Sequence, residues 1–289
     1  RIHNKDKAIA VSVDSSANYC KSHPITGGKQ IVCENWRNLI SAGAKPIAIT
    51  NCLNFGNPED EMIMGEFAEC LEGIKEACEF LDYPVVSGNV SFYNGTNKKN
   101  INPTPVIGGV GLINKLSKPI GQNFKKDKSS IILIGKTFGH LEQSCFLKEN
   151  YSITDGMPPE INLLNEKNNG ENVLKLIQDK LVLSSHDISS GGLIVALSEM
   201  SMSSYYGVKI QKPKKLTNLY EYFFGEDQGR YILEIEPTNL TIVEKILKDN
   251  KIYYENIGST QKDNFEIENE VKISIKDLFK VNNEWYSNY

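Results

Sequence analysis

The sequence contains no long apolar stretch. Its longest apolar runs, such as Ile131–Ile134, have the length of a strand, whereas a membrane-spanning helix needs about 20 apolar residues. No secretory signal precedes the first predicted strand. We therefore expect no membrane association.

The sequence also has no surplus of positive charge. Its 32 Lys and Arg residues face 36 Asp and Glu, which gives a formal net charge of −4. Because nucleic-acid-binding proteins show a basic stripe, we expect no nucleic-acid partner. Arginine is scarce, at positions 1, 37 and 230 only. In a sequence that otherwise uses lysine, Arg37 and Arg230 are candidates for roles that need the forked donors of a guanidinium group.

Paired cysteines are absent as well. The six cysteines form no CxxC motif, and the four histidines do not cluster with them. This distribution argues against a zinc site and is typical of a reduced compartment, so we expect a cytoplasmic protein.

The length of 289 residues favours about two domains. The polar, basic segment Asn114–Ser129 is the best candidate for a boundary. We predict a first domain at 1–114, a linker at 115–129 and a second domain at 130–289. The chain starts at Arg1 and not at Met, and we interpret it as a piece of a longer polypeptide.

Apolar periodicity predicts alternating strands and helices. Strands are expected at 8–13, 46–50, 84–93, 104–113, 130–135, 230–236 and 251–258, and helices at 27–44, 61–82, 158–180, 191–204, 238–250 and 275–286. Residues 51–60 are expected to form a loop, and Thr238 is expected to cap a helix. This order predicts an α/β or α+β fold.

The segment Ser87–Ser91 combines polar side chains with a glycine. In a strand, Ser87, Asn89 and Ser91 share one face, and Gly88 lets a ligand approach the backbone. Hard oxygen ligands beside a glycine suit a phosphate–Mg²⁺ site. The alternative is a bulged strand with a solvated polar face.

The segment Asn51–Glu59 follows a short apolar strand, and Asn51 is the first polar residue after it. In α/β folds, ligands bind beyond the carboxyl ends of strands. The alternative is a loop whose Asn and Gly residues serve turn geometry.

A third segment, His186–Leu193, places Asp187 and Ser189 before a Gly-Gly helix start. Free N–H groups at such a start can receive an anion, although either side chain could instead cap the helix. Because adjacent residues of an extended chain point apart, we do not expect His186 and Asp187 to act as a pair.

A fourth segment, Phe224–Arg230, supplies oxygen ligands and one guanidinium group. The oxygen ligands are Glu226, Asp227 and Gln228, and the guanidinium belongs to Arg230. The alternative is a polar hairpin tip.

The order of these segments resembles the carboxyl-terminal half of the small-form phosphoribosylformylglycinamidine synthase family. The strings CLNFGNPE (52–59) and SGNVSFYN (87–94) are the most distinctive. The resemblance implies an aminoimidazole ribonucleotide synthetase-like architecture. An N-terminal domain completes a barrel with a second copy, and a C-terminal α+β domain has a split β-α-β core.

The resemblance also implies a function in purine (IMP) biosynthesis. The family's ATP- and Mg²⁺-dependent C–N ligase converts formylglycinamide ribonucleotide and ammonia to formylglycinamidine ribonucleotide. The implied partners are the first half of the same synthase, a separate glutaminase subunit and a small accessory subunit. The family's catalytic histidines lie in the first half, so no catalytic residue is assigned here and this piece is not expected to be active alone. The alternatives are a free-standing homodimeric relative and a non-catalytic nucleotide-binding module.

The resemblance assigns site residues by position. Asn51 and Gly88 correspond to ATP contacts, Asn89 to a Mg²⁺ ligand and Ser91 to a substrate contact. The family usually has aspartate where Asn51 stands, so this chain keeps an oxygen acceptor there without its charge. A second, pseudo-symmetric site is implied at Asp187, Ser189, Glu226, Gln228 and Arg230.

Overall fold

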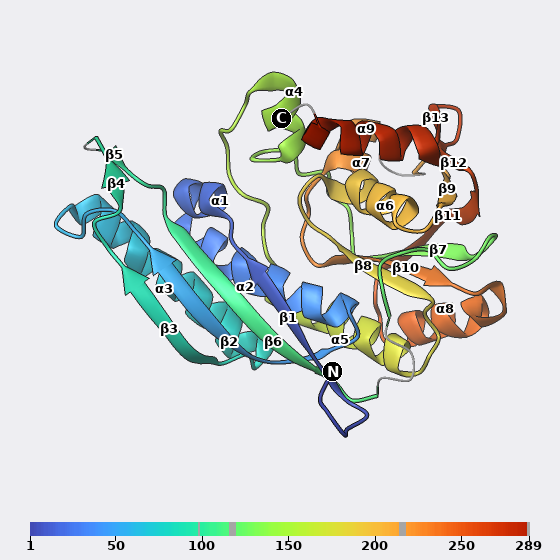
Figure 1. The fold of residues 1–289 in the computed structure, drawn as a ribbon, viewed down its shortest axis with the longest axis horizontal. Helices are drawn as coiled ribbons and strands as arrows, with labels where there is room; N and C mark the ends of the chain where they lie inside the picture. The colour runs from blue at the N-terminus through green and yellow to red at the C-terminus, as the bar shows by residue number, and fades with distance from the viewer. Residues whose placement is uncertain (98, 116–119, 214–217, 288–289) are drawn as a thin grey trace. The chain divides into compact units, whose positions relative to one another are not determined.

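A computed structural model describes residues 1–97, 99–115, 120–213 and 218–287. The chain forms two compact units, shown in Figure 1. The first comprises Arg1–Pro119 with Leu141–Gly170, and the second Ile120–His140 with Glu171–Tyr289. The segment after residue 140 thus returns to the first unit. The predicted linker at 115–129 lies partly outside the described residues, and the domain bounds stay a prediction.

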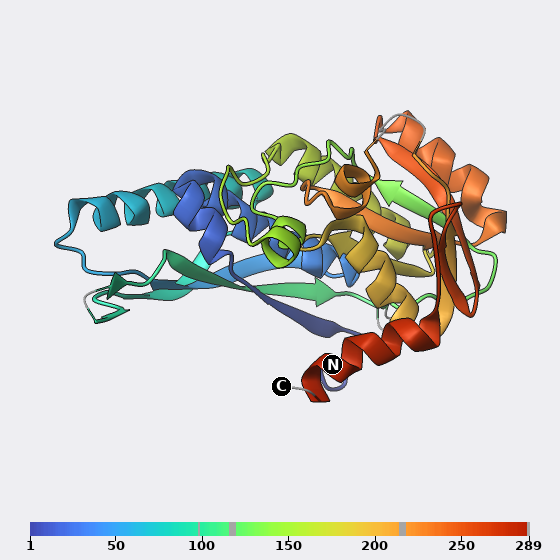
Figure 2. The same ribbon diagram turned by 90° about the horizontal axis from the view of Figure 1, so that it is seen from above.

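The first unit is built on a four-stranded sheet in the order β1-β6-β2-β3. β2 and β3 are parallel, and the other pairs are antiparallel. Figure 2 shows α2 and α3 on the same face of this sheet. The elements of this unit are β1 (Ala8–Asp14), α1 (Ala17–Ser22), α2 (Pro24–Ser41), β2 (Lys45–Asn54), α3 (Glu61–Leu81), β3 (Val85–Ser91), β4 (Gly95–Thr96), β5 (Lys99–Asn100), β6 (Thr104–Ile113), α4 (Cys145–Tyr151) and the start of α5 (Leu163–Gln178).

The long helix α3 confirms the helix predicted at 61–82. The Asp60 carboxylate accepts a hydrogen bond from the Met62 amide at 3.0 Å and caps the first turn. The helix ends at Asp82, whose φ of 53° places it in the left-handed region. Its apolar stripe, with Ile63 and Ile74, is buried.

The other face of this sheet carries exposed apolar side chains. Strand alternation turns Ala8 inward and leaves Ile9, Val11 and Val13 exposed by 55%, 67% and 66%. Val110 of the neighbouring strand β6 is also exposed. Exposed apolar side chains thus gather on this face of the sheet.

A buried ion pair joins α2 to the start of α5 within the first unit. Arg37 Nη1 lies 2.7 Å from Glu166 Oε1, and both side chains are almost fully buried. This contact uses one guanidinium nitrogen, so the fork role of Arg37 stays a prediction. Removing one partner of such a buried pair costs about 3–5 kcal/mol.

The second unit is built on a seven-stranded sheet in the order β13-β12-β9-β11-β7-β10-β8. Its elements are β7 (Ser130–Ile134), the rest of α5, β8 (Ser184–Ile188), α6 (Gly192–Met202), β9 (Tyr206–Ile210), α7 (Leu219–Phe224), β10 (Arg230–Ile235), the 3₁₀ helix η1 (Pro237–Asn239), α8 (Leu240–Asp249), β11 (Tyr254–Lys262), β12 (Asn264–Ile267), β13 (Val271–Ser274) and α9 (Ile275–Ser287).

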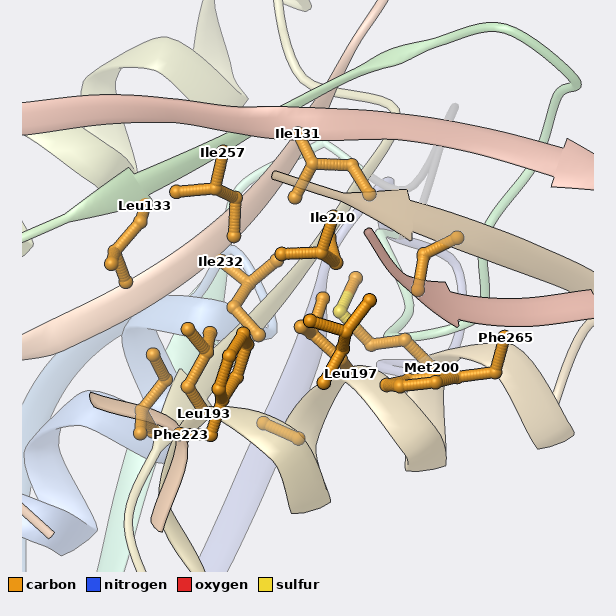
Figure 3. Packing of buried hydrophobic residues seen from close by; sticks show 14 of the residues in the cluster. Ile131, Leu133, Leu193, Leu197, Met200, Ile210, Phe223, Ile232, Ile257 and Phe265 are labelled. Atoms are coloured by element: carbon orange, nitrogen blue, oxygen red, sulfur yellow. The ribbon is translucent and has the colours of Figure 1, made fainter. Parts of the chain in front are cut away.

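The core of the second unit lies between its sheet and α6 (Figure 3). Leu193 and Leu197 of α6 pack against strand residues such as Ile131 and Ile232. Their apolar surface contributes about 25 cal/mol per Å² removed from water.

Three local predictions differ from the structure. Asn51–Asn54 continue strand β2 and do not form a loop, because β3 and β6 pair with this stretch on both sides. Thr238 lies inside η1, and Asn239 takes the cap position of α8. The strand expected at 251–258 is Tyr254–Lys262, because β7 pairs with it as far as Ser259 and β9 as far as Lys262.

Candidate functional site

The pairing of β2 with β3 arranges the predicted ATP, Mg²⁺ and substrate residues. In the parallel register Asn51 lies opposite Gly88, Cys52 opposite Asn89, and Asn54 opposite Ser91. Neighbouring residues of paired strands share a face. Asn51 and Gly88 therefore lie together on one face, and Asn89 and Ser91 on the other.

Gly88 makes room for the Asn51 side chain. A Cβ atom at Gly88 would lie 1.9 Å from Asn51 Oδ1. No side chain other than hydrogen fits there while Asn51 keeps its position, so the two predicted ATP contacts depend on each other.

Asn51 lines a cavity of about 530 Å³ between the sheet edge and α3. The apolar side of the cavity includes Leu71 and Ile74 of α3, and Lys75 and Glu79 also line it. Apolar walls with a few polar groups are typical of small-molecule sites. The Asn51 side-chain amide can donate one hydrogen bond to the edge of a flat ring in this cavity and accept another from it.

The opposite face carries neutral oxygen atoms. Thr50 Oγ1 and Ser87 Oγ are 2.8 Å apart, which confirms that Ser87 points to this side. Asn89 is exposed, and Asn94 donates to Ser91 Oγ at 3.1 Å. Mg²⁺ is usually held by one or two carboxylates together with phosphate oxygens. Asn89 can thus supply one ligand, and the charged ligands must come from elsewhere.

Within the described ranges, no group of three or more His, Cys, Asp or Glu side chains is arranged to hold a metal ion. All six cysteines are free thiols. None of the helices in the described part of the chain is long and apolar enough to cross a membrane.

In the second unit, His186 lies between two carboxylates. His186 Nδ1 is 3.3 Å from Asp187 Oδ1, and Nε2 is 3.0 Å from Glu199 Oε2. The expectation that His186 and Asp187 do not act as a pair was therefore wrong, because their side chains lie within hydrogen-bonding distance of each other.

These contacts make His186 a cation at neutral pH. Burial by itself lowers the pKa of His186, but the hydrogen bonds and charges of Asp187 and Glu199 outweigh it and raise the pKa to about 10. A histidine with this pKa is a poor general base near pH 7.

The start of α6 already receives a carboxylate. Glu226 Oε1 accepts the Gly191 amide at 2.7 Å, and Gly191 occupies the cap position with a φ of 80°. The Ser189 carbonyl accepts the Gly192 amide at 3.1 Å. Neither Asp187 nor Ser189 occupies the helix-capping position proposed for them as the alternative.

Asp227 and Arg230 stabilise the segment 224–230 through hydrogen bonds to backbone groups. The Asp227 carboxylate accepts three consecutive backbone amides, those of residues 138, 139 and 140, at 2.9–3.3 Å. Arg230 donates from Nε to the Asp227 carbonyl at 2.8 Å and from Nη2 to the Gly225 carbonyl at 2.6 Å. Its predicted fork role is confirmed. Gln228 Nε2 donates to the Glu226 carbonyl at 2.9 Å.

The polar residues of the segment 224–230 thus make hydrogen bonds that stabilise the local fold, and the sequence did not indicate these contacts. A ligand role for Asp187, Ser189, Glu226, Gln228 and Arg230 stays a prediction. Sequence reasoning also missed the α3 wall of the Asn51 cavity, although Lys75 and Glu79 stand one helical turn apart in the predicted helix.

Sequence comparisons identify the family. Residues 1–113 match the family described as AIR synthase related protein, N-terminal domain, and residues 129–268 match its C-terminal domain. The chain belongs to the AIR synthase related protein family. Its N-terminal domain carries Asn51, Gly88, Asn89 and Ser91.

Within this family, the chain is similar along its whole length to phosphoribosylformylglycinamidine synthase subunit PurL. It is 53% identical over 289 residues to the Pelagibacter ubique protein and 42% identical to that of Rhodopseudomonas palustris. It spans 40% and 39% of their lengths, respectively.

Solved structures share the two-domain AIR synthase related fold. A Thermotoga maritima PurL complexed with FGAR superposes with a TM-score of 0.78 at 16% identity, over 94% of this chain and 46% of that one. A thiamine-monophosphate kinase from Stenotrophomonas maltophilia superposes with a TM-score of 0.68 at 12% identity, over 92% and 87% of the two chains. At these identities the likeness concerns the fold alone.

Proposed function

We propose that this chain is the second half of an ATP-dependent phosphoribosylformylglycinamidine synthase of purine biosynthesis. Similarity to PurL over all 289 residues, at about two-fifths of the relatives' length, supports this assignment. The substrate is then formylglycinamide ribonucleotide, as in the complexed Thermotoga maritima protein. The remaining half and a glutaminase that supplies ammonia are its partners, in keeping with the Thermotoga maritima structure named PurLQS.

Asn51, which lines the α3 cavity and lies close to Gly88, supports the ATP part of this proposal. We propose that the cavity takes the adenine base of ATP, with Asn51 hydrogen-bonding to the ring edge. Adenine presents adjacent donor and acceptor atoms, and an amide pairs with both. The asparagine therefore replaces the family's usual aspartate without loss of base recognition.

Mg²⁺ and the substrate belong to the opposite side of the same edge strand. We propose that Asn89 provides one oxygen ligand to Mg²⁺ and that Ser91 contacts the substrate. A bound Mg²⁺ would neutralise charge on a transferred phosphoryl group. Because the oxygens around Asn89 are neutral, the charged ligands would have to come from phosphate oxygens and from the other half of the enzyme.

The exposed apolar face of β1 and β6 fits the barrel expected for this family. We propose that a second sheet, from the other half of the synthase, covers Ile9, Val11 and Val13. Burial of this face on association is driven by the same hydrophobic effect that forms a core.

The test is the Asn51→Ala variant of the full-length synthase. Removal of the amide should raise the KM for ATP about tenfold, with little change in the KM for formylglycinamide ribonucleotide. The matched control is Asn283→Ala on α9, whose amide donates to the Phe279 carbonyl. An unchanged KM for ATP in Asn51→Ala would refute the placement of the base.

A further inference from the structure

The second unit contains a separate cavity of about 610 Å³. It lies where β7 and β9 end and β11 begins, with Lys136, Gln211 and Tyr253 just beyond these strands. In the described chain, none of the residues assigned above to ATP, Mg²⁺ or substrate lines it. Its volume is that of a site for a small organic molecule.

Four aromatic residues contribute to the walls of this cavity. Tyr222, Tyr253 and Tyr254 line it, and Phe138 stands at it with 75% of its surface exposed. Ile257, which is buried, adds an apolar surface. Such walls favour a flat ring that packs against aromatic faces.

A carboxylate with spare acceptor capacity lies among these rings. Glu255 Oε1 accepts the Tyr253 hydroxyl at 2.7 Å, and Oε2 accepts the Tyr222 hydroxyl at 3.4 Å. Burial and the neighbouring Glu255 raise the pKa of Tyr253 to about 12, so this hydroxyl stays a donor at neutral pH. Each carboxylate oxygen has two lone pairs, so both can accept one further hydrogen bond from a ligand.

The ammonium group of Lys136 lies over the ring of Tyr253, whose hydroxyl donates to Glu255. Lys136 Nζ is 5.7 Å from the centre of the Tyr253 ring. Among the described residues no carboxylate lies within ion-pairing distance of it, whereas Lys212, also in the cavity wall, pairs with Glu270. Lys136 is therefore the cation of this cavity that is available to an anionic ligand.

We propose that this cavity binds a nucleotide-class ligand, a planar heteroaromatic ring with an exocyclic amino group and an anionic tail. The ring packs against Tyr253 and Tyr254, which are partly exposed, whereas Tyr222 is buried. The amino group donates to Glu255, and the tail lies against Lys136. The site is distinct from the Asn51 cavity of the first unit.

Calorimetric titration of the protein with adenosine monophosphate, without Mg²⁺, tests this proposal. Binding is expected, and Lys136→Met should weaken it about tenfold, equal to 1.4 kcal/mol. Lys136 is exposed, so the variant should fold normally. The matched control, Lys251→Met, removes another exposed lysine near β11 that does not line the cavity, and it should bind like the parent.

Inosine monophosphate separates ligand recognition from mere charge attraction. It carries a carbonyl in place of the amino group, so the parent protein should prefer adenosine monophosphate, and Glu255→Gln should reduce this preference. The proposal is overturned by absence of binding at millimolar nucleotide, or by unchanged binding in Lys136→Met. Binding that is lost in Asn51→Ala but kept in Lys136→Met would overturn it too, because the nucleotide would then occupy the first unit.

Discussion

At the scale of single residues, Gly88 decides what Asn51 can do. Its missing side chain leaves the space that Asn51 Oδ1 occupies, only 1.9 Å from where a Cβ atom of residue 88 would lie. The glycine is needed for this close approach and not for an unusual backbone angle, because its φ is not in the left-handed region.

Gly88→Ala should therefore displace the Asn51 side chain. In the full-length synthase we expect the KM for ATP to rise about tenfold, equal to about 1.4 kcal/mol, with a small change in melting temperature because β3 is exposed. Gly65→Ala is the matched control, since a Cβ there meets nothing within 4 Å. Equal ATP kinetics in the two variants would contradict the proposed coupling of Gly88 to Asn51.

Asn89→Ala should change the Mg²⁺ dependence of turnover more than it changes folding. Asn89 is exposed, so truncation leaves no packing defect. Loss of one metal ligand should slow turnover about tenfold and raise the Mg²⁺ concentration needed. Asn89→Asp, which keeps an oxygen ligand, should retain Mg²⁺ use. A normal Mg²⁺ profile in Asn89→Ala, with a lowered melting temperature, would show that Asn89 is only a strand residue.

At the scale of elements, the His186 side chain links strand β8 to helix α6. The imidazole of the strand contacts Glu199 of the helix and Asp187 of its own strand. The folded state binds the proton more tightly than the unfolded state, because the pKa of His186 is raised from its ordinary value of 6.5 to about 10.

This linkage predicts how stability depends on pH. The contribution of protonated His186 is fully present below about pH 6.5 and is lost as pH rises towards 10. The difference in melting temperature between the parent and His186→Gln should shrink over this interval. Glu199→Gln, which removes one of the two carboxylates, should shift the loss to lower pH. A difference that stays constant from pH 6 to 10 would contradict the raised pKa.

The exposed face of β1 is the second feature at this scale. Its valines alternate with inward-facing residues, so one face of the strand carries exposed apolar side chains. We expect the isolated chain to associate through this face. Replacement of Val11 and Val13 by lysine should give a monomer in light scattering, with little change in melting temperature. Val281→Lys, at an exposed valine of α9, is the control and should leave association unchanged.

At the scale of the whole molecule, the chain is expected to lack synthase activity by itself. The resemblance assigns no catalytic residue to it, and it spans about 40% of its relatives' length. We expect no amidine from the purified chain supplied with ATP, Mg²⁺, ammonium and formylglycinamide ribonucleotide. Addition of the remaining half should restore turnover. Steady product formation by the chain alone would instead favour a free-standing homodimeric enzyme.

The sequence by itself determined the elements whose signal is local. The apolar stripe and Asp60 cap predict α3, and the alternation of Ala8–Val13 predicts β1. Motif order also identified the family, because the strings around Asn54 and Asn89 are distinctive. Short or polar strands such as β8 and β13 were missed, since cross-strand partners stabilise them and their own composition does not.

Only the tertiary structure decided which side chains meet. The β2–β3 register places Asn51 over Gly88 and separates both from Asn89, and no local pattern specifies a register between strands more than 30 residues apart. Likewise, no local pattern indicates that the Asp227 carboxylate accepts hydrogen bonds from backbone amides almost 90 residues earlier in the chain. Such contacts follow from burial, because a buried carboxylate must find donors wherever the fold brings them.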